Sequence, residues 1–178
     1  MSENGNPDDA TLMAELDIAT ERADAWGRLL AVADEFAALS HDEEDFRWKR
    51  AERRADGAMV GGYPVYAERV ERACRALAEV GAVTPAYHWM QQRPPAVPDD
   101  GQLVPAEAVR LATAIVRGER FGYGTIGQAV ESGTLQAVLA SLSAWYRGRS
   151  SHRLGMSSVS GSAVPSSGGR DRCSVVWK

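Results

Sequence analysis

TLQAVLASLSAWYR, residues 134–147, has the clearest helical pattern in the chain and sets the predicted fold. Its large apolar side chains recur every three or four positions, so a helix gathers them on one face. These inward side chains are Leu135, Val138, Leu139, Leu142 and Trp145. A shorter helix is predicted just before it, over residues 125–132, with Thr125 as its N-cap and Gly133 at its end. Thr134 then caps the longer helix, whose apolar face predicts a helical core.

The same periodicity predicts further helices. The helix over residues 106–117 is expected to stack against residues 134–147, with the glycines between them letting the chain double back. Its inward stripe consists of Val109, Ala112, Ile115 and Val116. Residues 8–39 predict one long helix with a weak point at Gly27, because glycine lowers helix stability by about 1 kcal/mol relative to alanine. Residues 67–80 predict another amphipathic helix.

Residues 46–66 predict a short β-hairpin. Phe46 and Trp48 alternate with charged neighbours, and residues 55–57 offer a turn. A charged helix over residues 43–55 competes with this interpretation, because glutamate and arginine dominate there. The sequence leaves both open.

The remaining segments complete a mainly α fold, α+β at most. A short helix is expected from Pro85, and residues 93–101 form a connector that three prolines keep out of regular structure. The 178 residues suit one domain with loose ends. The expected divisions are a flexible N-terminus over residues 1–9, a single compact helical domain over residues 10–148 and a disordered Ser/Gly-rich tail over residues 149–178.

Charge is unevenly distributed along the chain. Residues 1–40 hold two Arg against nine Asp and Glu, residues 41–150 hold fourteen of each sign, and residues 151–178 hold four against one. The central part therefore lacks the basic excess of a nucleic-acid footprint. No apolar run approaches the roughly 20 residues that span a bilayer, and the acidic N-terminus is unlike an export signal. We expect a cytoplasmic protein with no membrane partner.

Gly122, Gly124 and Gly127 spell GxGxxG within FGYGTIGQ, residues 121–128. A dinucleotide loop with this spacing needs a strand before it and a long helix after it. Here the preceding segment is helical and the following helix is short. We therefore expect the glycines to permit a tight junction between helices.

The histidines and cysteines form no convincing site. His41, His88 and His152 share no metal-ligand spacing, so no metal is expected. A nucleophilic Cys74–His88 pair is disfavoured, because Cys74 lies on the apolar face of its helix, where a thiol is usually inert. Cys173 lies in the polar tail, which argues against a disulfide framework.

Arg117 and Arg120 flank Glu119 beside the glycine turn. Their guanidinium groups suit a phosphate or carboxylate ligand. Pairing with Glu107, Glu119 or Glu131 to brace the junction is the favoured alternative. A second set, Phe46, Trp48, Tyr63 and Tyr66, suits either a ligand groove or a cover for the core, of which the core is favoured.

Several dispersed motifs occur in the order of a known family. They are Phe46-Arg47-Trp48, Gly62-Tyr63-Pro64-Val65-Tyr66, Tyr87-His88-Trp89-Met90, Arg117-Gly118-Glu119-Arg120-Phe121, and Gly124 followed by Glu131-Ser132-Gly133-Thr134-Leu135. Over about residues 14–146 the chain resembles the bacterial family called domain of unknown function 6508. The resemblance implies a shared fold but no activity. It also implies that Gly122 and Gly127 stand where other residues are usual, so that the GxGxxG is accidental.

These observations predict a small cytoplasmic bacterial protein that binds another protein, with no cofactor and no catalytic residues. The candidate binding surface, suggested by the family framework, is Trp48, Tyr63, Tyr66, Trp89, Arg117, Arg120 and Phe121. The alternative is a nucleic-acid-binding helix-turn-helix over residues 125–147 with nearby arginines, which is disfavoured because residues 134–147 offer few base-reading side chains. A hydrolase or transferase using Glu119 and Arg120 is the weakest interpretation.

Overall fold

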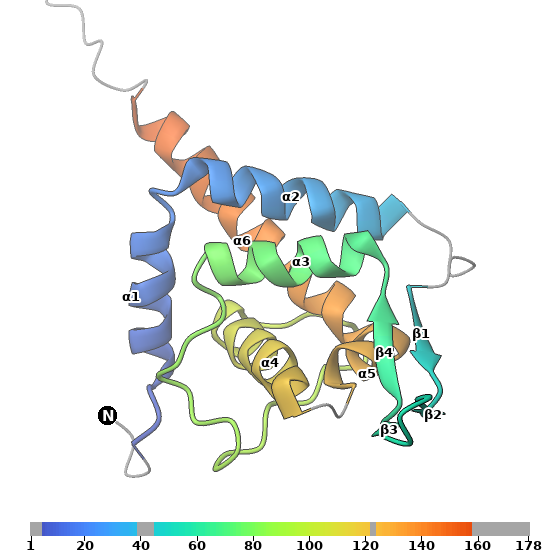
Figure 1. Ribbon diagram of the computed structural model, residues 1–178. Coiled ribbons are helices and arrows are strands. Elements are labelled where there is room, and N and C mark those ends of the chain that lie inside the picture. Colours follow the sequence, from blue (N-terminus) through green and yellow to red (C-terminus); the bar gives the residue numbers. More distant parts are fainter. Residues whose placement is uncertain (1–4, 39–44, 122–123, 158–178) are drawn as a thin grey trace, which may run out of the picture.

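The computed structural model describes residues 5–38, 45–121 and 124–157, and within these ranges the protein is mainly helical (Figure 1). This confirms the predicted fold class. The elements are α1 (Asp9–Ala19), α2 (Ala23–Ala38), β1 (Phe46–Lys49), β2 (Glu52–Arg53), β3 (Met59–Val60), β4 (Tyr63–Tyr66), α3 (Glu68–Glu79), α4 (Pro105–Gly118), the 3₁₀ turn η1 (Glu119–Phe121), α5 (Thr125–Glu131) and α6 (Thr134–Ser157).

Helix α6 is the centre of the helical body. It packs against both α2 and α4, α2 also packs against α3, and α1 packs against α4 (Figure 1). The predicted stacking of residues 106–117 against residues 134–147 is therefore confirmed. Trp26 of α2 is fully buried, stacks on Tyr146 of α6 with ring centroids 4.5 Å apart, and donates its indole N–H to the carbonyl of Ala19 at 3.0 Å.

The prediction of one long helix over residues 8–39 is wrong. Asp8 does cap its start, accepting a hydrogen bond from the backbone N–H of Thr11 at 2.9 Å. The chain then breaks at residues 20–22, where the Thr20 hydroxyl bonds back to a carbonyl, and Gly27 lies inside α2. This break sets the apolar face of α2, whose buried residues are Ala25, Trp26, Leu29, Val32, Ala33 and Phe36.

The helix expected after Pro85 is absent, since residues 82–104 contain only turns and irregular backbone. Asn6 holds this segment in place: its side chain accepts from the backbone N–H of His88 at 2.6 Å and donates to the Gln92 side chain at 3.0 Å. Tyr87 is fully buried and donates its hydroxyl to the Gln92 carbonyl at 3.1 Å. Polar groups that a helix would pair locally thus find partners elsewhere. The predicted connector over residues 93–101 is confirmed as irregular.

The hairpin prediction is confirmed, and the charged helix over residues 43–55 is wrong for the described residues 45–55. Strand β1 pairs antiparallel with β4, and β2 pairs with β3. Every residue from Arg47 to Tyr63 is exposed, so most of the hairpin lies outside the body (Figure 1).

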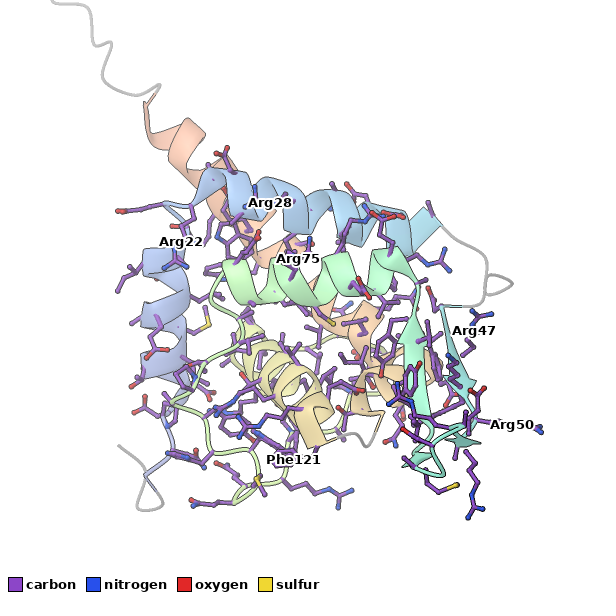
Figure 2. The ribbon with its side chains drawn as sticks, in the orientation of Figure 1. Arg22, Arg28, Arg47, Arg50, Arg75 and Phe121 are labelled. Atoms are coloured by element: carbon purple, nitrogen blue, oxygen red, sulfur yellow. The ribbon has the colours of Figure 1, made fainter. Side chains whose placement is uncertain are left out.

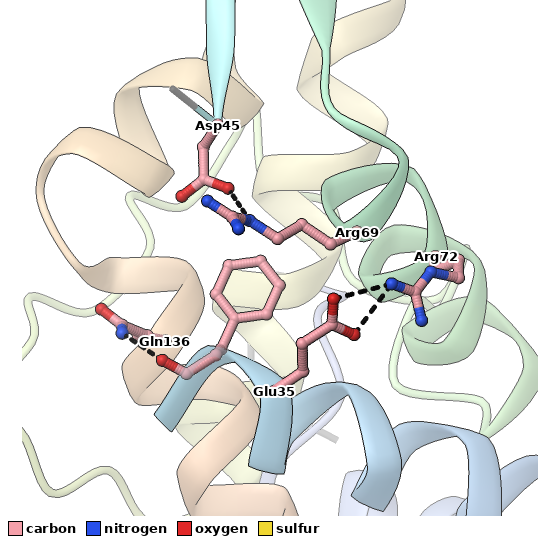
Figure 3. Close-up of polar contacts among 6 residues, drawn as sticks. Glu35, Asp45, Arg69, Arg72 and Gln136 are labelled. Atoms are coloured by element: carbon pink, nitrogen blue, oxygen red, sulfur yellow. Dashed lines mark hydrogen bonds and ion pairs between the residues drawn. The ribbon is translucent and has the colours of Figure 1, made fainter. Parts of the chain in front are cut away.

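The base of the hairpin is tied to the helical body by ionic contacts. Arg69 at the start of α3 pairs with Asp45, directly before β1, and is only 9% exposed (Figure 3). Next to it, Arg72 donates to both carboxylate oxygens of Glu35 in α2 at 2.8 Å (Figure 3). The Asp45–Arg69 pair fixes the start of the hairpin beside α3, whereas the Glu35–Arg72 pair joins α2 to α3.

Helix α6 ends later than predicted. It continues to Ser157, so the first part of the expected disordered tail, residues 149–157, is helical. The Arg149 guanidinium pairs with Asp17 at 2.9 Å and lies 5.2 Å from the Trp145 ring, which supports this extension. Residues 158–178 of the predicted tail, and residues 1–4 of the predicted flexible N-terminus, lie outside the described residues.

Candidate functional site

An apolar groove of about 680 Å³ opens beside α4. Ligand sites in proteins are commonly of this size and apolar character. The irregular segment before α4, α4 itself, η1 and the start of α5 all contribute to it. Its lining residues are Trp89, Met90, Pro94, Leu111, Ala114, Ile115, Phe121 and Thr125.

Large apolar side chains at the groove face water. Met90 is 72% exposed and Phe121 is 43% exposed. The Phe121 ring lies 6.1 Å from the Trp89 ring in a tilted arrangement, so the two aromatic residues form one wall. A contiguous apolar surface of this kind is typical of a binding site. Neither Met90 nor Leu111 was predicted as a site residue. The one hint of the groove in the sequence is the apolar Met90 directly after Trp89.

The two arginines near the groove have different roles. Arg117 donates to the Thr84 carbonyl at 3.3 Å and so braces α4 against the irregular segment. Bracing was the favoured prediction, but the partner is a carbonyl rather than a glutamate. The Arg120 guanidinium instead lies 5.1 Å from the centre of the Phe121 ring, at the edge of the groove. Arg120 is exposed, which leaves its charge accessible to a ligand.

The Glu119 side chain, from the turn before α5, caps the N-terminus of this helix. Its carboxylate accepts from the backbone N–H of Ile126 at 3.0 Å and from the Thr125 hydroxyl at 3.2 Å. The expectation that Thr125 caps this helix is wrong, because the N-cap position belongs to Gly124, which has φ +64 and no side chain. A carboxylate from the preceding turn supplies the missing acceptor. These bonds give Glu119 a structural role at the start of α5.

The glycines of the GxGxxG make room for the hairpin. A Cβ on Gly124 would lie 2.6 Å from the Trp48 ring, and one on Gly127 would lie 2.7 Å from the Phe46 ring. Both are sub-van-der-Waals separations, so any other residue would require the Trp48 or Phe46 ring to shift. Gly122 lies outside the described residues, and the helical elements α4 and η1 lead into the turn where a dinucleotide loop needs a strand. Gly124, with φ +64, lies at the expected helix-to-helix junction between η1 and α5, and Gly118 permits a second close approach there, where a Cβ would meet Thr125 at 3.1 Å.

The predicted surface therefore divides into two parts. Trp89, Phe121 and Arg120 meet at the groove, whereas Arg117 is bound to the Thr84 carbonyl. Trp48 and Tyr63 belong to the hairpin, where they are 52% and 43% exposed.

Tyr66, at the base of the hairpin, is half-buried rather than displayed. Within the described part of the chain its hydroxyl oxygen has no hydrogen-bond partner. Burial, followed by the nearby Glu119 carboxylate, raises the pKa of this hydroxyl. Tyr66 therefore belongs to the core edge, as the core interpretation of the aromatic set expected.

Cys74 is unsuited to nucleophilic chemistry. Burial, with smaller contributions from Glu119 and Glu71, raises the pKa of its thiol to about 12. No hydrogen bond joins it to His88, which is exposed in the irregular segment. Across residues 5–38, 45–121 and 124–157, no three His, Cys, Asp or Glu side chains gather to hold a metal ion. His41 and His152, and the side chain of Cys173, are not among the described groups.

The basic character of the hairpin was missed. Residues 47–54, RWKRAERR, hold five cations against one glutamate. Summing charge over residues 41–150 hid this cluster, because acidic residues elsewhere cancel it. A shorter window would have found it.

The family comparison matches residues 21–148 to the Family of unknown function (DUF6508), which is most of the chain. The chain belongs to this family. The DUF6508 match runs from the break before α2 into α6 and so includes both the groove and the hairpin, whereas α1 precedes it. No curated protein and no solved structure matches the chain. Among the described helices, none has the length and apolar character required to cross a bilayer.

Proposed function

We propose that this DUF6508 protein is a non-enzymatic, cytoplasmic binding module whose groove receives an apolar segment of another protein. The observation that carries the proposal is the exposure of Met90 and Phe121 beside Trp89. Covering such side chains contributes roughly 1.5–3 kcal/mol each. A mixed aromatic, aliphatic and methionine wall suits a peptide side chain as an anchor.

Charge at the groove edge supports a peptide over a purely apolar ligand. Arg120 is exposed at the Phe121 ring and available to a carboxylate or a backbone carbonyl of the bound segment. Arg117 is already engaged by Thr84 and holds the groove wall. The arrangement therefore offers one apolar anchor site with one adjacent cation.

The test is selection of peptides from a display library against the full-length protein, followed by calorimetry. In the groove variant Met90→Gln/Phe121→Ala, affinity is expected to fall at least about 10-fold, since the apolar burial is lost. The matched control is Met59→Gln/Tyr63→Ala on the hairpin, because Met59 is 63% exposed and Tyr63 is 43% exposed. The control should bind within about threefold of the wild type, since surface substitutions away from a contact change free energies by only about 0.5 kcal/mol.

A second measurement locates the bound peptide. The indole N–H resonance of Trp89, assigned with Trp89→Phe, should shift on peptide addition. Peptides that bind without shifting this resonance, or that lose affinity equally in both variants, contradict the proposed groove function.

The nucleic-acid alternative over residues 125–147 gains no support. The α6 side chains Leu135, Val138, Leu139 and Leu142 are buried, and the helix is covered by α2 and α4. Arg147 is held by both carboxylate oxygens of Asp34 at 2.6 and 2.8 Å. A recognition helix requires a free face and free cations.

A further inference from the structure

The hairpin displays cations that no carboxylate of the described residues pairs with. Residues 47–54 carry a net charge of +4, five cations less one glutamate. Among the described residues, none of these cations forms an ion pair with a carboxylate. The five are Arg47, Lys49, Arg50, Arg53 and Arg54.

Arginines on the helices behave differently. Arg28 pairs with Glu79 at 2.8 Å, Arg72 with Glu35 at 2.8 Å and Arg147 with Asp34 at 2.6 Å. Their side chains are 58%, 44% and 52% exposed, so exposure alone does not leave an arginine unpaired here. The unpaired hairpin cations are therefore available to an external polyanion.

Aromatic rings accompany the cations on both faces of the hairpin. The register pairs Lys49 with Tyr63 and Trp48 with Pro64, which places Lys49 and Tyr63 on one face and Trp48 on the other. The Lys49 ammonium lies 5.6 Å from the centre of the exposed Tyr63 ring. Arg47 and Arg50 project away from the helices (Figure 2).

We propose that this hairpin binds single-stranded nucleic acid, through a surface separate from the groove. Arginine and lysine neutralise backbone phosphates, and exposed aromatic rings accept stacked bases. The exposed faces of Trp48 and Tyr63 provide such rings beside the cations. A duplex offers phosphates but no unstacked bases, so the aromatic residues favour a single strand.

The tip of the hairpin argues against a membrane partner. An inserting tip carries large apolar side chains. Residues 55–58 are Ala-Asp-Gly-Ala, and the Asp56 carboxylate accepts from the backbone N–H of Ala58 at 3.0 Å, so a negative charge occupies the turn. A charged turn of small residues does not suit insertion.

The first experiment measures binding of a fluorescent single-stranded oligonucleotide of about 20 nucleotides, longer than one typical site. The full chain is used, so that Asp42, Glu43 and Glu44 before the hairpin contribute their charge. Anisotropy should report binding at low salt. The logarithm of the affinity should fall against the logarithm of salt with a slope of about −3, for roughly four phosphates contacted. Absence of binding at low salt overturns the proposal.

Matched charge variants locate the surface. Arg50→Ala/Arg53→Ala/Arg54→Ala removes three unpaired cations, whereas Arg28→Ala/Arg72→Ala/Arg147→Ala removes three paired ones and changes the net charge equally. The hairpin variant should lose at least about 10-fold in affinity, and its salt slope should become shallower by about 2. The helix variant should stay near the wild type. Equal losses in both overturn the proposal.

A third arm tests the aromatic contribution and the competing partner. Tyr63→Ala should weaken single-strand binding by about fivefold or more, as expected for loss of one stacked base, and affect duplex binding less. Vesicles containing phosphatidylserine should sediment little of the protein. Equal losses for single strand and duplex, or binding to these vesicles without binding to the oligonucleotide, overturn the assignment.

Discussion

Tryptophan and arginine side chains such as Trp26 and Arg72 are buried or paired in the helical body, but those of the hairpin are exposed, and its arginines are unpaired among the described residues. In the body, Trp26 is fully buried between helices and Arg72 is neutralised by Glu35. In the hairpin, Trp48 is 52% exposed and Arg50 has no carboxylate partner among the described residues. Aromatic residues and arginines stabilise the first region internally. In the second region, the same groups are largely exposed to solvent.

The two regions therefore contribute unequally to folding stability. Burial of apolar area is the main favourable contribution to folding, and the exposed hairpin supplies little of it. Its attachment relies on a few contacts at its base: the Asp45–Arg69 pair and the rings of Phe46 and Trp48 against α5. Mutations can test whether stability and binding are divided in this way.

Replacement of a tryptophan in each region is expected to give the largest contrast. Trp26→Ala removes the ring that stacks on Tyr146 and should lower the free energy of unfolding by about 3–5 kcal/mol. Trp48→Ala should lower it by less than about 1 kcal/mol, because half of this side chain is already in water. Urea unfolding followed by circular dichroism measures both. Similar losses for the two variants show that the hairpin is an integral part of the cooperative body.

The ionic contact at the hairpin base should give the next largest effect. Arg69→Met leaves Asp45, which is 21% exposed, without its partner and should cost about 2–3 kcal/mol. The neighbouring variant Arg72→Met breaks an exposed pair with Glu35 and should cost at most about 1 kcal/mol. Thermal unfolding compares them, and hydrogen exchange reports whether Arg69→Met loosens the hairpin amides selectively. A larger loss in Arg72→Met contradicts the importance of the buried tie.

Substitutions of Glu119 test the stability of α5, the helix against which the hairpin rings pack. Glu119→Ala removes the acceptor for the Ile126 N–H and should destabilise the protein by about 1–2 kcal/mol. Glu119→Gln keeps an acceptor oxygen and should cost less than about 0.5 kcal/mol beyond the lost charge. Chemical denaturation distinguishes the two substitutions. If both substitutions cost the same, the carboxylate charge rather than the hydrogen bond is what α5 needs.

Local sequence patterns predicted the elements whose side chains repeat regularly. The stripe from Leu135 to Trp145 indicated α6, and the alternation around Trp48 indicated the hairpin. The break at residues 20–22 could not be predicted, because it depends on Trp26 reaching the Ala19 carbonyl across the break. The irregular segment depends in the same way on Asn6, which is distant in sequence.

The site was predictable only in part. Trp89, Arg120 and Phe121 were named from the family framework and do meet at the groove. No local pattern joins them to Leu111 or Met90, since that proximity follows from the fold of an irregular segment. The contacts of Gly124 and Gly127 with the hairpin rings were missed for a similar reason. Phe46, about 80 positions before Gly127, defines the space available there.

The smallest predicted effect concerns two helical glycines, one exposed and one buried. A Cβ added to Gly27 in α2 would have no packing neighbour within 4 Å, so Gly27→Ala should stabilise the protein by about 0.5–1 kcal/mol through helix propensity. In Gly127→Ala the same gain is offset by overlap with the Phe46 ring, giving a net loss of about 0.5–1 kcal/mol.

The double variant Gly127→Ala/Phe46→Leu assigns the cause of that loss. If the Phe46 ring produces it, the loss from Gly127→Ala should shrink or reverse when leucine replaces the ring, and the coupling energy should be about 0.5–1 kcal/mol. The same pairing of Phe46→Leu with Gly27→Ala should be additive, because those sites share no contact. Additivity in both pairs means that the ring does not press on α5. The hairpin would then be held mainly by the Asp45–Arg69 pair and the Trp48 ring, and its separation from the body would be sharper than these contacts indicate.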